Sequence, residues 1–223
     1  MNAPLRLILF DVDGTLVDSQ GSIVSAMTAA FGALSLPVPE RADILSIVGL
    51  SLPHAMARLA AEQSASVQNS LVEAYKEAYH AQRLEQGAAQ SPLYPGALGV
   101  LQALHAVPEN LLGVATGKSQ RGLDALLEVH GLEHYFVTRQ VADHHPSKPH
   151  PSMIDTARAE TGVEAASTVM IGDTSFDMQM AKAAGVAGVG VSWGYHAAES
   201  LRDAALVIDS FEQLSPALND LWN

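Results

Sequence analysis

The chain has 223 residues, 48% of them hydrophobic and 16% charged, which is typical of one domain with an insertion or of up to two domains. Its 24 acidic side chains against 12 Lys and Arg give a net charge of −12, which argues against nucleic-acid binding. The lack of cysteine excludes disulfides, thiolate nucleophiles and zinc–thiolate sites. With no signal-peptide pattern and no apolar run of about 18 residues, we expect a cytoplasmic protein without a membrane partner.

Short apolar segments, each followed by polar residues, alternate with helical patterns along most of the chain. The predicted strands are 5–10, 111–115, 136–142, 168–172 and 186–191, and the helices between and before them are 96–106, 119–130, 151–161 and 175–184. Three of these helices are followed by a glycine, as helix ends commonly are. The alternation predicts an α/β fold with a doubly wound, parallel, Rossmann-like sheet.

Residues 19–91 break this alternation because they contain helical patterns only. We expect helices at 22–34, 41–48, 52–62 and 67–86. The sequence therefore predicts a catalytic core formed by 1–18 and 92–223, with 19–91 inserted as an all-helical cap. Since the insertion follows the first strand directly, we expect it to cover a ligand at the end of that strand. The alternative is a helical subdomain that only enlarges the core.

The first predicted strand ends in Asp11-Val12-Asp13-Gly14-Thr15. Ligands of α/β folds bind at the carboxyl ends of parallel strands, so we expect chemistry at these two carboxylates. A solvated Asp-Gly turn is the alternative interpretation of this motif taken alone.

Further polar residues follow the other predicted strands: Thr116, Lys148 and Asp173. Each is compatible with an ordinary turn, loop or helix start, but as a set they have one chemical use. Carboxylates such as Asp11 and Asp173 are the oxygen ligands that Mg²⁺ prefers. A lysine, a threonine hydroxyl and the backbone N–H groups near Gly117 can bind phosphoryl oxygens. Positioning and charge stabilisation of this kind are what phosphoryl transfer requires.

These motifs resemble those of the haloacid dehalogenase superfamily of hydrolases. The order is that of the family: Asp11 to Thr15, then Thr116, then Lys148 within Ser147 to Pro151, then Gly172 to Asp177. The resemblance covers essentially the whole chain and is closest to helical-cap phosphatases similar to phosphoglycolate phosphatase. It implies a magnesium-dependent phosphatase that acts on a small-molecule phosphate.

The resemblance also implies a role for each motif residue. Asp11 would attack phosphorus and form an aspartyl-phosphate. Asp13 would protonate the leaving alkoxide and later take a proton from water, which requires that it start protonated. The metal would be held by Asp11, Asp173 and the backbone carbonyl of Asp13. Phosphate would be bound by Thr116, Gly117 and Lys148, with Asp177 in support.

The substrate is less well defined by the sequence. Relatives place a substrate-specificity loop where this chain has Gly49, Leu50 and Ser51, between two predicted helices. Those that act on phosphoglycolate tend to have a cation just before the glycine, whereas residues 44–48 contain none. Arg41, Arg58 or His54 could take its place, and an ordinary helix connection is the alternative for the loop.

Other activities of the superfamily are disfavoured by single residues. The acid at Asp13 argues against carbon–halogen cleavage, which does not use one. The sugar phosphomutase of this branch carries a cap histidine twelve residues after the nucleophile, where this chain has Ile23. A phosphomutase and a non-catalytic phosphate-binding module remain as alternatives. The sequence does not indicate an oligomeric state.

Overall fold

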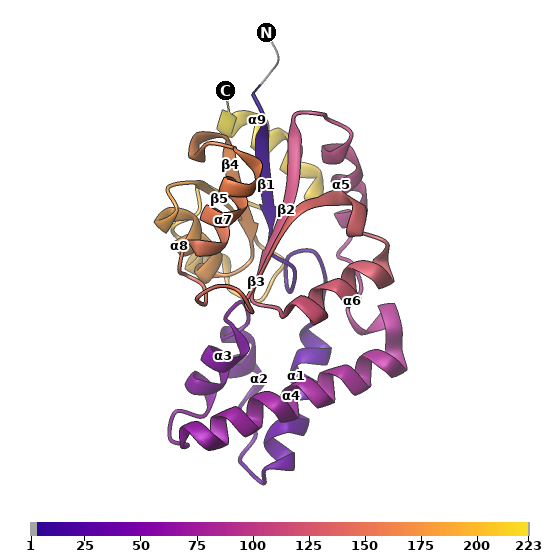
Figure 1. The fold of residues 1–223 in the computed structure, drawn as a ribbon, viewed down its shortest axis with the longest axis vertical. Helices are drawn as coiled ribbons and strands as arrows, with labels where there is room; N and C mark the ends of the chain where they lie inside the picture. Colours follow the sequence, from indigo (N-terminus) through magenta and orange to yellow (C-terminus); the bar gives the residue numbers. More distant parts are fainter. Residues whose placement is uncertain (1–3, 223) are drawn as a thin grey trace.

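A computed structural model, which describes residues 4–222, contains a six-stranded parallel sheet (Figure 1). The strands are β1 (Arg6–Phe10), β2 (Asn110–Thr116), β3 (Phe136–Val141), β4 (Thr168–Gly172), β5 (Ala187–Val191) and β6 (Leu206–Ile208). Their order in the sheet is β3-β2-β1-β4-β5-β6, and every pairing is parallel. The predicted α/β fold class is therefore confirmed, although β6 was not predicted.

Helices cover both faces of the sheet. On one face lie α5 (Ala97–His105), α6 (Gln120–His130) and α9 (Leu214–Trp222), and on the other α7 (Ser152–Thr161) and α8 (Ser175–Ala183). Alternate residues of β1 point to opposite faces, so Ile8 packs with the first group and Leu9 with the second. A strand buried on both sides is apolar throughout, which explains the continuous apolar run from Leu7 to Phe10. The described residues also form five short 3₁₀ helices: Gly87–Gln90, Glu133–Tyr135, Ala165–Ser167, Ala198–Ser200 and Phe211–Gln213.

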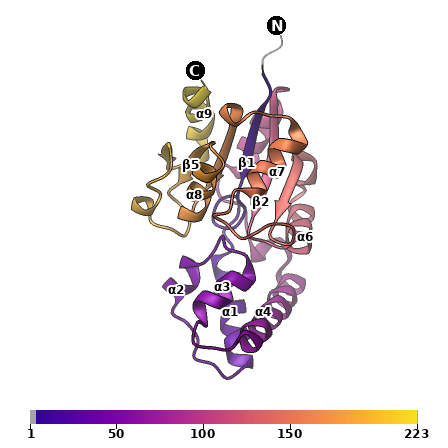
Figure 2. The same ribbon diagram turned by 60° about the vertical axis from the view of Figure 1, so that its left-hand side comes forward.

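The helical insertion, residues 20–86, lies beyond the carboxyl ends of the strands (Figures 1 and 2). It consists of α1 (Gln20–Ala33), α2 (Arg41–Ser46), α3 (Leu52–Leu59) and α4 (Ala65–Gln86), close to the helices predicted there. Met27, Met56 and Leu71 are among the buried residues of its own hydrophobic cluster. The exact boundaries of the two domains, 18/19 and 91/92, stay a prediction.

Polar contacts and an aromatic side chain join the insertion to the loops of the sheet. The backbone N–H of Ser51 donates to Ser147 Oγ at 2.9 Å, and His196 Nε2 lies 3.1 Å from the carbonyl oxygen of Ser46. Phe176, at the start of α8, packs in the hydrophobic cluster of the insertion. Across residues 4–222, no helix combines the length and apolar character needed to cross a membrane.

Candidate active site

The sheet order brings three predicted site residues to one edge. Strand β1 lies between β2 and β4, so Asp11, which follows β1, has Thr116 on one side and Asp173 on the other. All three side chains are buried, with no more than 1% exposed. The carboxyl ends of the central strands thus bring together three side chains that are 57 to 162 residues apart in the chain.

Asp11 is a buried carboxylate with unused hydrogen-bonding capacity. Lys148 Nζ lies 3.0 Å from its Oδ1, but the ammonium is aligned for hydrogen bonding with Asp177 Oδ1, at 2.6 Å. Within the described residues, neither oxygen of Asp11 accepts a well-aligned hydrogen bond. Burial raises the pKa of Asp11 to about 7, with Lys148 opposing the rise and Asp177 and Asp13 adding to it. A carboxylate kept this way is available to a cation or to an electrophile.

Lys148 is equally buried, at 2% exposed. Burial alone lowers the pKa of Lys148, but the carboxylates of Asp11 and Asp177 outweigh it, so the pKa stands above its ordinary value. The side chain is therefore a fixed positive charge beside Asp11.

Asp11, Asp173 and Asp177 each offer a carboxylate oxygen within 4.8 Å of the others. Burial, and then the charges of Asp177 and Asp11, raise the pKa of Asp173 well above its usual range. Asp173 accepts one hydrogen bond on each oxygen, from Thr15 Oγ1 at 3.0 Å and from the N–H of Tyr195 at 2.8 Å. A bound cation would relieve the repulsion in this cluster, so the donor set fits a divalent metal ion.

Asp177 is engaged differently from the other two. Its Oδ2 accepts from the backbone N–H of Thr174 at 3.0 Å and from Thr174 Oγ1 at 2.6 Å. The backbone N–H of Asp177 donates to Thr174 Oγ1 at 3.3 Å, which completes the capping box of α8. The Oδ1 of Asp177 holds Lys148. Because its Oδ1 is paired with the ammonium of Lys148, which would repel a metal ion, Asp177 fits the orientation of Lys148 better than the direct binding of a metal ion.

Two glycines allow loops to approach Asp173 closely. A Cβ on Gly14, which has a φ of +88°, would lie 2.3 Å from Asp173 Oδ2, and one on Gly194 would lie 2.0 Å from Asp173 Cβ. Any side chain at either position would displace the carboxylate.

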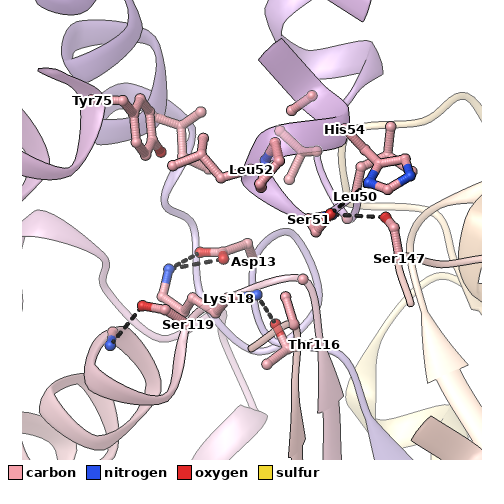
Figure 3. Close-up of a pocket in the computed structure, with 18 of the residues that line it drawn as sticks. Asp13, Leu50, Ser51, Leu52, His54, Tyr75, Thr116, Lys118, Ser119 and Ser147 are labelled. Atoms are coloured by element: carbon pink, nitrogen blue, oxygen red, sulfur yellow. Dashed lines mark hydrogen bonds and ion pairs between the residues drawn. The ribbon is translucent and has the colours of Figure 1, made fainter. Parts of the chain in front are cut away.

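Asp13 lies slightly apart from this acidic cluster, against a lysine that the sequence analysis missed. Lys118 Nζ lies 2.8 Å from both carboxylate oxygens of Asp13, and Figure 3 shows the lysine pointing toward this carboxylate. Ser19 Oγ donates to Asp13 Oδ1 at 2.6 Å. Burial alone lowers the pKa of Lys118, but Asp13 and Tyr79 raise it above its ordinary value. The signal available in the sequence was position, because Lys118 is only two residues beyond the strand-end Thr116.

A cavity of about 560 Å³ lies between the insertion and the strand ends, within the usual range for small-molecule sites. Asp11, Asp13 and Thr116 line it on the side of the sheet. The predicted loop residues Gly49, Leu50 and Ser51 line it on the side of the insertion (Figure 3 shows Leu50 and Ser51). Gly117, which directly follows β2, also lines it. Lys148, Asp173 and Asp177 lie behind this lining.

Arg41, Arg58 and His54 were the candidates to replace the cation that is missing from the loop before Gly49, and only His54 lines the cavity. His54 lines the cavity, with Nδ1 3.0 Å from Ser51 Oγ. Arg41 instead donates to Gln20, and the guanidinium of Arg58 lies 5.2 Å from the ring centre of Phe176. Four further basic side chains, which the sequence analysis did not identify, also line the cavity: Lys76, His80, Arg83 and Arg121.

The fold and the site together define an enzyme with an acidic centre at the strand ends of a parallel sheet. A family model described as haloacid dehalogenase-like hydrolase matches residues 8–191, and the chain belongs to this family. It is 39% identical to "Probable phosphatase IndB" of Dickeya dadantii over 96% of this chain and 94% of that protein. It is 30% identical to phosphoglycolate phosphatase of Salmonella typhimurium, over 96% and 92% of the two chains.

Solved structures show the same fold at lower identity. A hydrolase from Pseudomonas syringae superposes with a TM-score of 0.85, at 24% identity, over 98% of this chain and 100% of that one. The beta-phosphoglucomutase of Clostridium difficile gives 0.83 at 20% identity, over 98% and 97%. With the phosphatase relatives, the predicted class, a phosphatase of the haloacid dehalogenase-like family, is confirmed.

Proposed function

We propose that this enzyme hydrolyses the phosphomonoester of a small metabolite, with Mg²⁺ as cofactor and Asp11 as nucleophile. The observation that carries the proposal is the state of Asp11, which is buried beside Lys148 with both carboxylate oxygens free of aligned donors. A carboxylate with a structural role would have its lone pairs satisfied. The cavity in front of it provides room for a substrate.

In the proposed reaction, Asp11 attacks phosphorus and forms a carboxylate–phosphate bond while the bond between phosphorus and the leaving oxygen breaks. Asp13, which is paired with Lys118 in the structure, must hold a proton once the substrate is bound, and it gives this proton to the leaving oxygen. Water then attacks the phosphoryl group, Asp13 takes a proton from it, and the bond to Asp11 breaks to release inorganic phosphate. Thr116, Gly117 and Lys148 bind the phosphoryl oxygens throughout.

The metal would be held by Asp11, Asp173 and the backbone carbonyl of Asp13. When bound, Mg²⁺ would supply positive charge that offsets the phosphoryl group and the clustered carboxylates. Asp177 would keep Lys148 in place through its 2.6 Å hydrogen bond.

The test is the release of phosphate from p-nitrophenyl phosphate with and without Mg²⁺. We expect turnover that depends on Mg²⁺, and its loss in Asp11→Asn. Asp220→Asn is the matched control, because Asp220 is exposed on α9 and outside the cavity. Equal turnover in Asp11→Asn and the native enzyme would contradict the proposal.

A sugar phosphomutase is the second candidate, since one structural neighbour has that activity. At the position where the mutases of this branch carry a histidine, Ile23 lines the cavity and has no proton to transfer. Incubation with a hexose 1-phosphate separates the two activities, because a mutase would accumulate the 6-phosphate before free phosphate.

A further inference from the structure

Several cationic side chains line the cavity, from helix α4 of the insertion and from the segment that follows β2. The chain carries only 12 Lys and Arg, yet Lys76, Arg83, Lys118 and Arg121 all line the cavity. Lys118 is paired with Asp13, and Lys76 with Glu73. Across residues 4–222, neither Arg83 nor Arg121 has a carboxylate within ion-pair distance. Among the four cations that line the cavity, these two are therefore the ones whose charge no carboxylate offsets.

The two arginines meet at one histidine. Arg83 Nη2 lies 2.9 Å from His80 Nδ1, and Arg121 Nη2 lies 3.1 Å from His80 Nε2. A neutral imidazole has one acceptor nitrogen and one N–H, so it can accept a hydrogen bond from only one of the two guanidinium groups. The other guanidinium faces a donor. Two like charges therefore lie beside one imidazole, and Arg121, which is exposed, keeps N–H donors that an anion in the cavity can accept.

The local helix geometry supports the same conclusion. Lys76, His80 and Arg83 follow one another at four and three residues along α4, so they share one face of that helix. Arg121 is the second residue of α6, at the positive end of the helix dipole, where a cation is disfavoured. Neither feature helps the protein to fold, but both help it to bind an anion.

Lys118 contacts both the reaction centre and helix α4, which carries His80 and Arg83. Lys118 Nζ bonds Asp13 and lies 3.4 Å from Tyr79 Oη, and Tyr79 directly precedes His80. Asp143 is the remaining carboxylate in the lining, and its Oδ2 accepts from the backbone N–H of Gln120 at 2.8 Å. The phosphoryl position and the arginine pair are therefore two regions of one cavity.

We propose that the leaving group of the substrate carries a second anionic group, a carboxylate or a phosphate, which is bound between Arg83 and Arg121. The inference rests on the proposed function, because it assigns the far end of the same substrate. A guanidinium pair is suited to both anions, since each offers oxygen atoms that can accept parallel N–H bonds.

The test uses substrate pairs that differ in the second anion. One pair is 3-phosphoglycerate and glycerol 3-phosphate, which differ by a carboxylate in place of a hydroxymethyl group. The other is fructose 1,6-bisphosphate and fructose 1-phosphate, so the two pairs distinguish a carboxylate from a phosphate. In the native enzyme we expect kcat/KM to favour the anionic member of at least one pair by roughly tenfold or more, the worth of one charge-assisted hydrogen bond.

Arg83→Gln and Arg121→Gln should each reduce that preference by roughly tenfold, through KM more than kcat. Arg202→Gln is the matched control, because Arg202 is exposed and outside the cavity, and it should keep the preference. Equal kcat/KM within both pairs overturns the inference, and so does an equal loss on both members, which would show that the arginines only hold α4 against α6. Absence of turnover with every substrate, p-nitrophenyl phosphate included, would instead reject the proposed function itself.

Discussion

Lys148→Met tests whether the lysine compensates two buried carboxylates. Methionine has a similar shape without the charge, so the variant leaves Asp11 and Asp177 buried without their cation. Removing one partner of a buried ion pair costs about 3–5 kcal/mol in the free energy of unfolding. For a chain of this size each kcal/mol lowers Tm by about 2–4 °C, so we expect a fall of about 6–20 °C at neutral pH without metal.

The loss should depend on pH. The pKa of Asp11 is raised by burial to about 7 from an ordinary value of 3.8, so between these values the folded state holds a proton that the unfolded chain has lost. The stability of the metal-free protein therefore falls as pH rises through that window. Lys148 opposes the rise in the pKa of Asp11, so its removal extends the window upward. The variant should be closest to the native protein near pH 5 and furthest from it near pH 8.

Thermal unfolding in EDTA at pH 5, 6, 7 and 8 measures this effect. Lys148→Met with Asp11→Asn should recover part of the loss, because one uncompensated charge is gone. Lys182→Met is the matched control, since its pair with Asp203 is on the surface, with the lysine side chain 69% exposed, and such pairs contribute about 0–1 kcal/mol. A fall in Tm that is the same at pH 5 and pH 8 would refute the reasoning.

Three further substitutions test the surroundings of the site. Mg²⁺ at about one hundred times its Kd should raise the free energy of unfolding by about 2.7 kcal/mol, and Asp173→Asn should abolish this rise in thermal unfolding; a full rise in the variant would contradict the assignment of the metal. Thr15→Val removes the 3.0 Å hydrogen bond to Asp173 and should cost about 1–3 kcal/mol in urea unfolding, whereas an unchanged midpoint would show that the bond is dispensable. Gly117→Ala places a Cβ 2.6 Å from the carbonyl oxygens of Gly49 and Leu50, so it should cost about 1–3 kcal/mol and raise KM; native stability and KM would show that the loop can move aside.

The sheet and the helices were largely predictable because burial on both faces makes each parallel strand a continuous apolar run. The last strand, β6, has only three residues and Val207 is 40% exposed, and the short apolar run from Ala204 to Ile208 that contains it was not predicted as a strand. Helix α9 follows it and was missed as well, although its buried Leu214 and Leu218 are four residues apart. Short elements at the edge of a sheet give only weak local patterns, because their formation depends on packing against the rest of the sheet.

The strand-end residues were found because each follows its own apolar run. Lys118 was missed because its partner, Asp13, is 105 residues earlier in the chain, and an ion pair at that distance has no local pattern. The same holds for Arg83 and Arg121, which are 38 residues apart in the chain and come together in the fold beside His80. Sequence motifs identify side chains that follow strands. Contacts between residues far apart in the chain, such as those of Lys118 and Arg121, can be identified only from the structure.

The arrangement of the loop at 49–51 connects the cavity with Lys148. The N–H of Ser51 donates to Ser147 Oγ at 2.9 Å, and Ser147 directly precedes Lys148. Gly117 lies under the same loop, where a Cβ would meet the carbonyl oxygens of Gly49 and Leu50. The insertion can therefore separate from the sheet only by breaking a hydrogen bond beside the lysine that faces Asp11. Because this contact lies next to Lys148 in the chain, we expect the segment that lines the cavity also to help position the charge beside the proposed nucleophile.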